Sequence, residues 1–151
     1  MEYLKPEPRQ KIPAKKKQQS DRMAKLNAEY RLALEEIDQE REPQCENCGA
    51  NSFDHSHLIP RNYNNYAYMA VTANIRRNCR TCHLAWEAGK LYLFPKVGQL
   101  YLDIVETLDE QYYRQKVEQF RKRMEEYKAK NWLALSNGSL KLPKWVENFF
   151  E

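Results

Sequence analysis

The chain reads Cys45-Glu46-Asn47-Cys48 and, further along, Cys79-Arg80-Thr81-Cys82-His83, and these two segments decide its fold. Between them lies Asp54-His55-Ser56-His57-Leu58-Ile59-Pro60-Arg61, followed by Asn74 at nine residues before His83. All four cysteines and all three histidines of the 151-residue protein fall between Cys45 and His83. We therefore expect a metal clamp and a reactive site to be built from one short segment.

Both Cys-x-x-Cys motifs have the spacing of zinc ligands. Each motif presents two sulfurs on one tight turn, and four thiolates hold one zinc ion in a closed tetrahedron that leaves no site for substrate. A unit this short has few large aliphatic side chains, so metal binding would supply much of its folding free energy. We therefore predict a structural Zn²⁺ ion bound by all four cysteines, Cys45, Cys48, Cys79 and Cys82. The alternative is a set of free or redox-active thiols.

Size and composition exclude several classes of protein. A chain of 151 residues fits one domain with extensions. Its apolar runs are too short for a transmembrane helix, and residues 1–6 lack the apolar region of a secretory signal, so we expect a cytoplasmic protein without a membrane partner. Paired cysteines in that setting favour metal binding over disulfides. The net charge of +4 and the pI of about 8.8 suit a polyanionic partner without requiring one.

Two segments are expected before the cysteine motifs. Residues 1–19 are rich in lysine and contain three prolines, which predicts a flexible basic arm. This arm is either a solvated tail or a DNA contact, and its candidate DNA-binding residues are Lys15, Lys16 and Lys17. Residues 20–42 are predicted to form a helix that Ser20 caps and Pro43 ends. Its core-facing stripe has spacings of three and four and consists of Met23, Leu26, Tyr30, Leu34 and Ile37.

Residues 91–151 are predicted to form a helical extension. The apolar run 91–95 suggests a short strand or an extended strap, and helices are expected at 100–108 and 110–130. The longer helix carries an apolar stripe of Tyr113, Val117, Phe120, Met124 and Tyr127. Three aromatic residues suggest a final short helix, namely Trp145, Phe149 and Phe150. Because the stripes on 20–42 and 110–130 share one period, we predict that these helices pack together beside the metal unit.

The predicted fold class is therefore α+β and mostly helical. A small zinc-stapled core at residues 43–90 would be flanked by the N-terminal helix and by the C-terminal helical extension, which would pack on both. Within the core, residues 53–59 are predicted to form a strand, with His55 and His57 on one face and Asp54 and Ser56 on the other. A polar loop rich in asparagine and tyrosine follows at 62–68, and it is either a nucleic-acid contact or a surface excursion.

A helix is expected directly after the second cysteine motif, over residues 83–89. On that helix His83 and Glu87 stand four residues apart, so both side chains project from one face. A histidine and a carboxylate at this spacing can share one divalent ion. The alternative is that Glu87 is a solvated helix residue.

These motifs together resemble the HNH endonuclease family, the ββα-metal nucleases. The family pattern is a histidine before a hydrophobic-x-Pro element, then an asparagine, then Cys-x-x-Cys-His. Here His57-Leu58-Ile59-Pro60, Asn74 and Cys79-Arg80-Thr81-Cys82-His83 match that pattern in order. Many members carry a first cysteine pair upstream, as Cys45 and Cys48 do here. The match covers residues 42–90, and the lysine-rich arm and flanking helices are similar to those of small bacteriophage HNH proteins.

The resemblance implies a role for each matched residue. His57 would be the general base that activates water, Asn74 would stabilise the loop and orient that histidine, and His83 would bind the catalytic metal. One position departs from the pattern, because the residue before the base is usually a metal-binding aspartate or histidine and here it is Ser56. Asp54, His55 or Glu87 would then complete the metal site.

A second register is also open for the general base. Asp54-His55-x-His57 is similar to the Asp-His-x-His of phage resolvase-like relatives, in which His55 would be the base and Asp54 the metal ligand. The Leu58-Ile59-Pro60 sequence that follows His57 favours His57 as the base.

The resemblance implies a metal-dependent endonuclease that hydrolyses DNA phosphodiester bonds, by nicking or by double-strand cleavage. The catalytic ion would be Mg²⁺ or Mn²⁺, with Zn²⁺ or Ni²⁺ as alternatives. DNA would be held through phosphates by the basic arm and by four arginines, Arg61, Arg76, Arg77 and Arg80. Phage packaging or recombination proteins are possible partners, and the chain would act as a monomer or homodimer. The rival interpretations are a non-enzymatic zinc-ribbon module that binds DNA or protein, and an inactive HNH scaffold.

Overall fold

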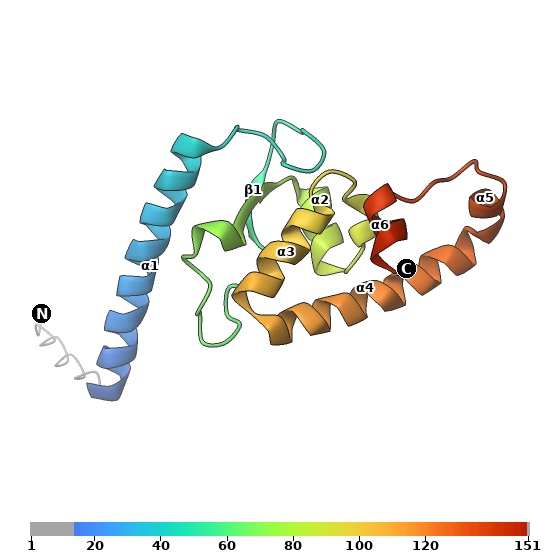
Figure 1. Cartoon of the computed structure of the whole chain (residues 1–151). Coiled ribbons are helices and arrows are strands. Elements are labelled where there is room, and N and C mark those ends of the chain that lie inside the picture. The colour runs from blue at the N-terminus through green and yellow to red at the C-terminus, as the bar shows by residue number, and fades with distance from the viewer. Residues whose placement is uncertain (1–13, 151) are drawn as a thin grey trace, which may run out of the picture.

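The computed structural model describes residues 14–150 as backbone and residues 21–150 with their side chains (Figure 1). It is an α+β fold in which helices predominate, as predicted. The elements in chain order are α1 (Ala14–Glu40), β1 (Asp54–His57), a 3-10 turn (Thr72–Asn74), β2 (Ile75–Asn78), α2 (Arg80–Glu87), a second 3-10 turn (Leu91–Leu93), α3 (Gly98–Leu108), α4 (Glu110–Lys130), α5 (Trp132–Ser136) and α6 (Lys144–Phe149).

The central unit consists of β1, β2 and α2. The two strands pair antiparallel, with Asp54 opposite Asn78 and His57 opposite Ile75. The chain then enters α2 through Cys79, whose sulfur caps the helix by accepting a hydrogen bond from the Cys82 N–H. A two-stranded sheet is marginally stable by itself. It therefore depends on α2 and on the flanking helices.

The main hydrophobic core lies between α2, α3 and α4, with Trp86 at its centre. Trp86 is buried, its indole N–H donates to the Leu58 carbonyl oxygen at 2.9 Å, and its ring contacts Phe94 and Tyr101 edge-on. Phe120 and Met124 of α4 close the same core. Because the indole joins α2 to the segment after β1, this packing holds the helix against the sheet.

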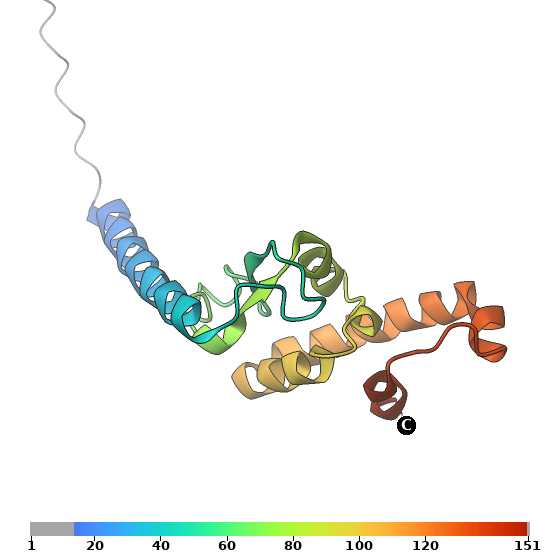
Figure 2. The same cartoon turned by 90° about the horizontal axis from the view of Figure 1, so that it is seen from above.

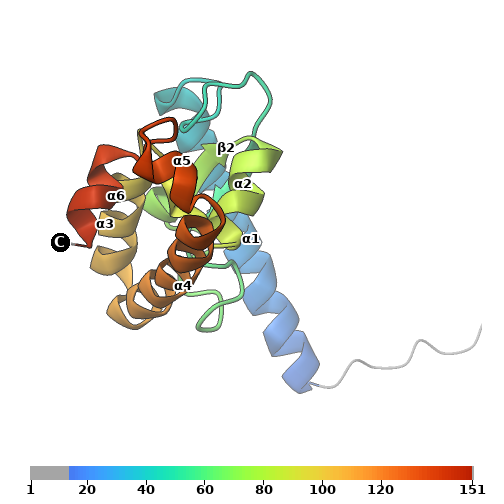
Figure 3. The ribbon, with the colours of Figure 1, turned by 90° about the vertical axis from the view of Figure 1, so that its right-hand side faces the viewer.

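The C-terminal segment also docks through an aromatic side chain. Trp145 of α6 donates to the Phe94 carbonyl oxygen at 2.8 Å and packs over Gly98, where a Cβ atom would overlap its ring. Figure 3 shows α6 beside α3, with α4 below them. The expected docking of a short aromatic C-terminal helix is therefore present, although α5 was not anticipated.

Helix α1 begins at Ala14, earlier than the expected start at Ser20. The sequence between Pro13 and Pro43 has no proline or glycine, and Ala14 to Gln19 are good helix formers, so the helix extends back to this point. Residues 14–19 are thus helical, not part of a flexible arm. The rest of the predicted arm, residues 1–13, and the side chains of Lys15, Lys16 and Lys17 lie outside what the structure describes.

The predicted packing of α1 against α4 is wrong. Figures 1 and 2 show the two helices on opposite sides of the central unit. Helix α1 buries Ala33 and Ile37 against Ile75 of β2 in a small cluster of its own, whereas α4 belongs to the Trp86 core. A period of 3.6 residues identifies the face of a helix that is buried but not the surface that buries it.

Polar contacts also fasten the carboxyl end of α1 to the central unit. Arg41 donates to the backbone carbonyl oxygens of Thr72 and Ile75, and Asp38 forms an ion pair with Arg77. These contacts place α1 along β2 and next to the histidines of β1.

The other boundaries agree with the expectations in part. The helix expected at residues 83–89 is α2, which begins at Arg80, before Cys82, and ends at Glu87. The helix at Glu110–Lys130 has its expected limits, with Asp109 as its N-cap, whereas β1 is shorter than the expected 53–59. Residues 91–93 form a 3-10 turn instead of a strand, with Leu91 and Phe94 buried. None of the helices in the described part of the chain combines the length and the apolar character needed to cross a membrane.

The small α1 cluster leads to a test of how α1 is attached. Ile37→Ala removes a side chain that is 1% exposed, and we expect it to lower the free energy of unfolding by about 2–4 kcal/mol because it leaves a cavity against Ile75. Leu32→Ala on the exposed side of the same helix is the matched control and should change stability by less than ~0.5 kcal/mol. Urea denaturation measures both, and equal effects would contradict this packing.

Candidate active site and metal centre

The four cysteines come together from two parts of the chain. Cys45 and Cys48 lie on the turn after α1, Cys79 caps α2, and Cys82 lies in its first turn. Their four sulfur atoms all lie within 4.8 Å of one another, and the Cys48 and Cys79 sulfurs are 3.6 Å apart. A tetrahedron with metal–sulfur bonds of 2.3 Å has sulfur–sulfur distances of about 3.8 Å, so the cluster has the dimensions to hold one metal ion.

Hydrogen bonds reach two of the four sulfur atoms, those of Cys45 and Cys82. The Cys48 N–H donates to the Cys45 sulfur at 3.5 Å, and the Asn47 amide donates to the Cys82 sulfur at 3.3 Å. Burial raises the pKa of Cys45, but backbone N–H groups, led by that of Cys48, outweigh it and lower the pKa to about 7. Burial raises the pKa of Cys82. A cation among the four sulfurs would favour the thiolate at every position.

His83 lies between two carboxylates. Its Nδ1 is 3.2 Å from Asp54 Oδ2, across from β1, and its Nε2 is 2.9 Å from Glu87 Oε1, one turn along α2. A carboxylate oxygen accepts hydrogen bonds, and either ring nitrogen of a histidine can donate one when it carries a proton. Imidazole and carboxylate are a donor set that divalent ions bind.

The two carboxylates contact opposite nitrogens of His83 and so do not converge. Among the side chains of residues 21–150, the four cysteines are the one group of three or more ligating residues whose atoms all lie within 4.8 Å. Asp54, His83 and Glu87 therefore do not form a single three-ligand set in this geometry. The structure brings each carboxylate to His83 separately.

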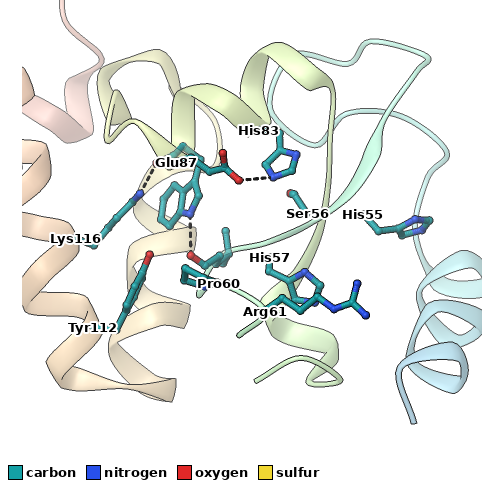
Figure 4. Close-up of a pocket in the computed structure, with 11 residues that line it drawn as sticks. His55, Ser56, His57, Pro60, Arg61, His83, Glu87, Tyr112 and Lys116 are labelled. Carbon is teal, nitrogen blue, oxygen red and sulfur yellow. Dashed lines mark hydrogen bonds and ion pairs between the residues drawn. The ribbon is translucent and has the colours of Figure 1, made fainter. Parts of the chain in front are cut away.

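His83 and Glu87 open into a pocket of about 360 Å³ that His57 also lines (Figure 4). Asp54 is not among the residues of its wall, whereas Ser56 is. The pocket is lined by β1 and the segment after it, by α2 and by α4, through His55, Ser56, His57, Leu58, Pro60, Arg61, His83, Trp86, Glu87, Tyr112 and Lys116. His57, which ends β1, and His83 of α2 therefore line the same pocket.

His57 is held in a defined tautomer. Its Nε2 is 2.9 Å from the Met69 carbonyl oxygen, and because that oxygen only accepts, Nε2 carries the proton and Nδ1 is left as an acceptor. The Tyr30 ring of α1 covers the imidazole at 5.6 Å between centroids. Burial lowers the pKa of His57 from 6.5, although the bond to Met69 opposes this effect. His57 is therefore neutral at physiological pH.

Asn74 is fully buried and does not touch His57. Its side chain accepts from the Ile59 N–H at 2.8 Å and donates to the carbonyl oxygens of Ile59 at 3.0 Å and Tyr68 at 3.1 Å. It thereby closes the base of the loop whose next residue, Met69, bonds His57. The expected effect of Asn74 on the histidine is thus indirect, through the loop.

The loop closed by Asn74 has an unusual backbone. Asn64, Asn65 and Tyr66 all have positive φ, with values of 47°, 58° and 65°. Asparagine tolerates this region better than most residues, but for tyrosine it costs roughly 1–2 kcal/mol. Arg22 of α1 donates to the Asn65 carbonyl oxygen at 3.1 Å, so α1 supports the loop in this conformation.

His55 is engaged elsewhere. Its Nε2 is 3.1 Å from Asp38 Oδ1 of α1, and the same carboxylate binds the Arg77 guanidinium. Those two hydrogen bonds, first from Arg77 and then from His55, hold the pKa of Asp38 below its usual value. Figure 4 shows His55 directed toward α1, away from His83. The alternative base therefore lies at the edge of the pocket, in contact with Asp38.

Two of the four predicted DNA-binding arginines are used inside the protein. Arg76 binds the Glu46 carboxylate through two nitrogens, at 2.9 and 2.5 Å. Arg77 is 3% exposed and donates to Asp38 and to the backbone carbonyl oxygens of Arg41 and Glu42. Both guanidinium groups therefore already have an acidic partner within the protein, whereas their predicted contact with DNA stays a prediction.

The other two arginines remain at the surface beside the pocket. Arg61 lies over the Tyr30 ring at 5.2 Å and lines the pocket. Arg80 has a side chain that is 73% exposed and lies 3.3 Å from Asp54 Oδ2. Both can reach a phosphate outside the pocket.

Lys116 and Tyr112 also line the pocket, although no motif in the sequence indicates them as site residues. Lys116 is 3% exposed, donates to the Trp86 carbonyl oxygen and lies 4.6 Å from the Trp86 ring centroid. Burial lowers its pKa to about 7. The available signal was its position, four residues before the buried Phe120, which places a lysine on the apolar stripe of α4.

No protein-family model, curated protein or solved structure matches this chain.

The cysteine cluster leads to a prediction of metal content. We expect purified protein to contain about one tightly bound Zn²⁺ per chain, because four thiolates complete one tetrahedron. Cys82→Ser should lose the ion and unfold at lower temperature, whereas Thr81→Ala in the same motif should do neither. Elemental analysis and thermal denaturation with and without chelator measure this. Retention of both metal and stability in Cys82→Ser would rule out the cluster as a metal site.

Proposed function

We propose that this protein is a metal-dependent endonuclease of the HNH type that hydrolyses DNA phosphodiester bonds. The observation that carries the proposal is that His57 from the strand side and His83 with Glu87 from α2 line one pocket. The order strand, strand, helix and the cysteine cluster that joins the first turn to α2 support the same assignment. The resemblance of residues 42–90 to the family pattern adds to this support.

His57 would act as the general base. Its Nε2–H is bound by the Met69 carbonyl oxygen, which leaves Nδ1 to accept a proton from water at the pocket. Because burial lowers the pKa of His57, the imidazole is neutral and ready to accept at physiological pH. Asn74 holds the loop that supplies the Met69 carbonyl, so it positions the base without touching it.

His83 and Glu87 would hold the divalent ion. Both side chains line the pocket, and their facing atoms, Nε2 and Oε1, are 2.9 Å apart. Asp54 approaches the opposite nitrogen from outside the pocket, where a carboxylate orients a metal-binding histidine. Such an ion would stabilise the charge that develops on the phosphate and on the leaving oxygen. Mg²⁺ or Mn²⁺ suits the mixed donor set, with Zn²⁺ or Ni²⁺ as alternatives.

DNA would be held mainly through its phosphates. Arg61 lines the pocket and Arg80 is exposed beside Asp54, so both can supply cationic contacts to DNA near the proposed reaction site. Such contacts would give salt-dependent binding with little sequence preference. In this proposal a Zn²⁺ ion in the cysteine cluster has a structural role. The protein would act in a bacterial cytoplasm, in phage DNA packaging or recombination.

One observation favours a second candidate, an inactive DNA-binding scaffold. Ser56 stands where the family has a metal-binding residue, and it is buried, donates to the Arg76 carbonyl oxygen and accepts from the Asn78 amide. A serine held in this way does not serve as a strong metal ligand. Activity must then come from the pair His83 and Glu87.

Plasmid nicking with paired histidine variants tests the proposed function. We expect wild type to nick supercoiled plasmid in Mg²⁺ or Mn²⁺ and His57→Ala to be slower by roughly 10²–10⁴-fold, because the base is lost. His55→Ala is the matched control on the same strand face and should keep most of the activity, since His55 binds Asp38. A wild type inert with every divalent ion would favour the scaffold, and loss of activity in His55→Ala alone would make His55 the base.

The environment of His57 predicts the pH dependence. Activity requires neutral His57, so kcat/KM should fall as the pH drops through the pKa of His57, which burial places below 6.5. Tyr30→Ala should move this midpoint up toward 6.5, because removal of the covering ring admits water. Nicking rates between pH 5 and pH 8 measure both midpoints, and a wild-type midpoint above 6.5 would contradict the assignment of the base.

A further inference from the structure

Lys116 lies in the wall of the pocket but comes from outside the central unit. It belongs to α4, and its side chain is 3% exposed. Figure 4 shows Lys116 and Tyr112 at one side of the pocket and His57 with Arg61 at the other. A cation is thus placed at the far end of the space from the exposed arginine.

Lys116 has no acidic partner among the side chains of residues 21–150. An ammonium group has three donors, and one of them goes to the Trp86 carbonyl oxygen. Burying a cation is costly, and the carbonyl oxygen, the indole face and the charge of the nearby Glu87 carboxylate compensate for it only in part, because burial still lowers the pKa of Lys116. The remaining donors are therefore available to an anion that enters the pocket.

A structural explanation accounts for only part of this arrangement. Lys116, Gln119 and Arg123 of α4 donate in turn to the carbonyl oxygens of Trp86, Glu87 and Ala88, at the carboxyl end of α2. Cations are favourable there because of the helix dipole. Gln119 and Arg123 make their bonds at the exposed surface, whereas the bond of Lys116 is buried and Lys116 lines the pocket. Capping alone does not require a buried charge.

We propose that Lys116 is a phosphate-binding residue that holds a DNA backbone phosphate next to the scissile one. This inference rests on the proposed nuclease function and extends it to a residue of the C-terminal extension. The scissile phosphate would lie at His57 and His83, with Arg61 on one side and Lys116 on the other. A phosphate supplies the negative charge that Lys116 lacks, so the cost of its burial falls when DNA is bound.

The salt dependence of DNA binding tests this role. In a His57→Ala background, which prevents cleavage, binding of a fluorescent DNA duplex is measured by anisotropy in Mg²⁺ at several salt concentrations. We expect Lys116→Met to weaken binding about tenfold and to reduce the slope of log K against log salt by about one, because one phosphate contact is lost. Lys116→Arg should restore most of the slope.

Gln119→Met is the matched control. It removes a neighbouring bond to the carboxyl end of α2 but does not line the pocket, so it should leave the slope unchanged. Circular dichroism establishes that each variant is folded, and Lys116→Gln, which keeps a donor for Trp86, replaces Lys116→Met if the latter unfolds. In the protein that retains His57, the single substitution Lys116→Met should raise the KM for DNA cleavage more than it lowers kcat.

The outcomes separate the two proposals. If wild type cleaves and binds DNA but folded Lys116→Met keeps the full salt slope, Lys116 does not bind phosphate and the nuclease proposal stands. A fall in kcat with unchanged KM would likewise overturn the phosphate role. If wild type neither binds nor cleaves DNA, the proposed function itself fails, and this inference fails with it.

Discussion

The convergence of four cysteines from two distant turns is the constraint on which the rest of the structure depends. Cys45 and Cys48 follow α1, whereas Cys79 and Cys82 open α2, and their sulfurs converge within 4.8 Å. This contact sets where α1 ends relative to where α2 begins. The strands between the two turns must then pair, and β1 is brought beside the face of α2 that carries His83. Positioning of the proposed reactive residues is therefore a consequence of the cluster, although the cluster itself lies outside their pocket.

Local features of the fold could be predicted well from the sequence, because they depend on nearby residues. The limits of α4 follow from Asp109 as a cap and from a sustained apolar stripe. The grouping of the four cysteines follows from their motif spacing. The alternation of β1 correctly separates Asp54, which reaches His83, from His57, which faces Tyr30 and Met69.

Features that depend on a partner elsewhere in the chain could not be predicted. Arg76 and Arg77 look like DNA contacts in sequence, but Glu46 and Asp38 neutralise them across the fold. Helix α1 has the stripe expected of a core helix, yet its partner is β2, not α4. Lys116 could not be predicted as a pocket residue from the sequence. An apolar stripe is identified by its hydrophobic residues, and a lysine on the same helix face is normally expected to be exposed. Only the structure shows that Lys116 is buried.

The contacts of Tyr30 and Lys116 have a consequence for where the site ends in the sequence. Tyr30 covers the imidazole of His57 from α1, and Lys116 closes the pocket from α4, so both lie outside the segment 43–90 that carries the recognisable motif. A fragment of residues 43–90 would keep every residue of the sequence motif. It would lose the Tyr30 ring that covers His57 and the wall of the pocket that α4 supplies. The same cysteine and histidine pattern placed between different flanking helices would give the strand histidine a different pKa and the pocket a different wall. The helices around the pattern can therefore alter the site while the pattern itself stays unchanged.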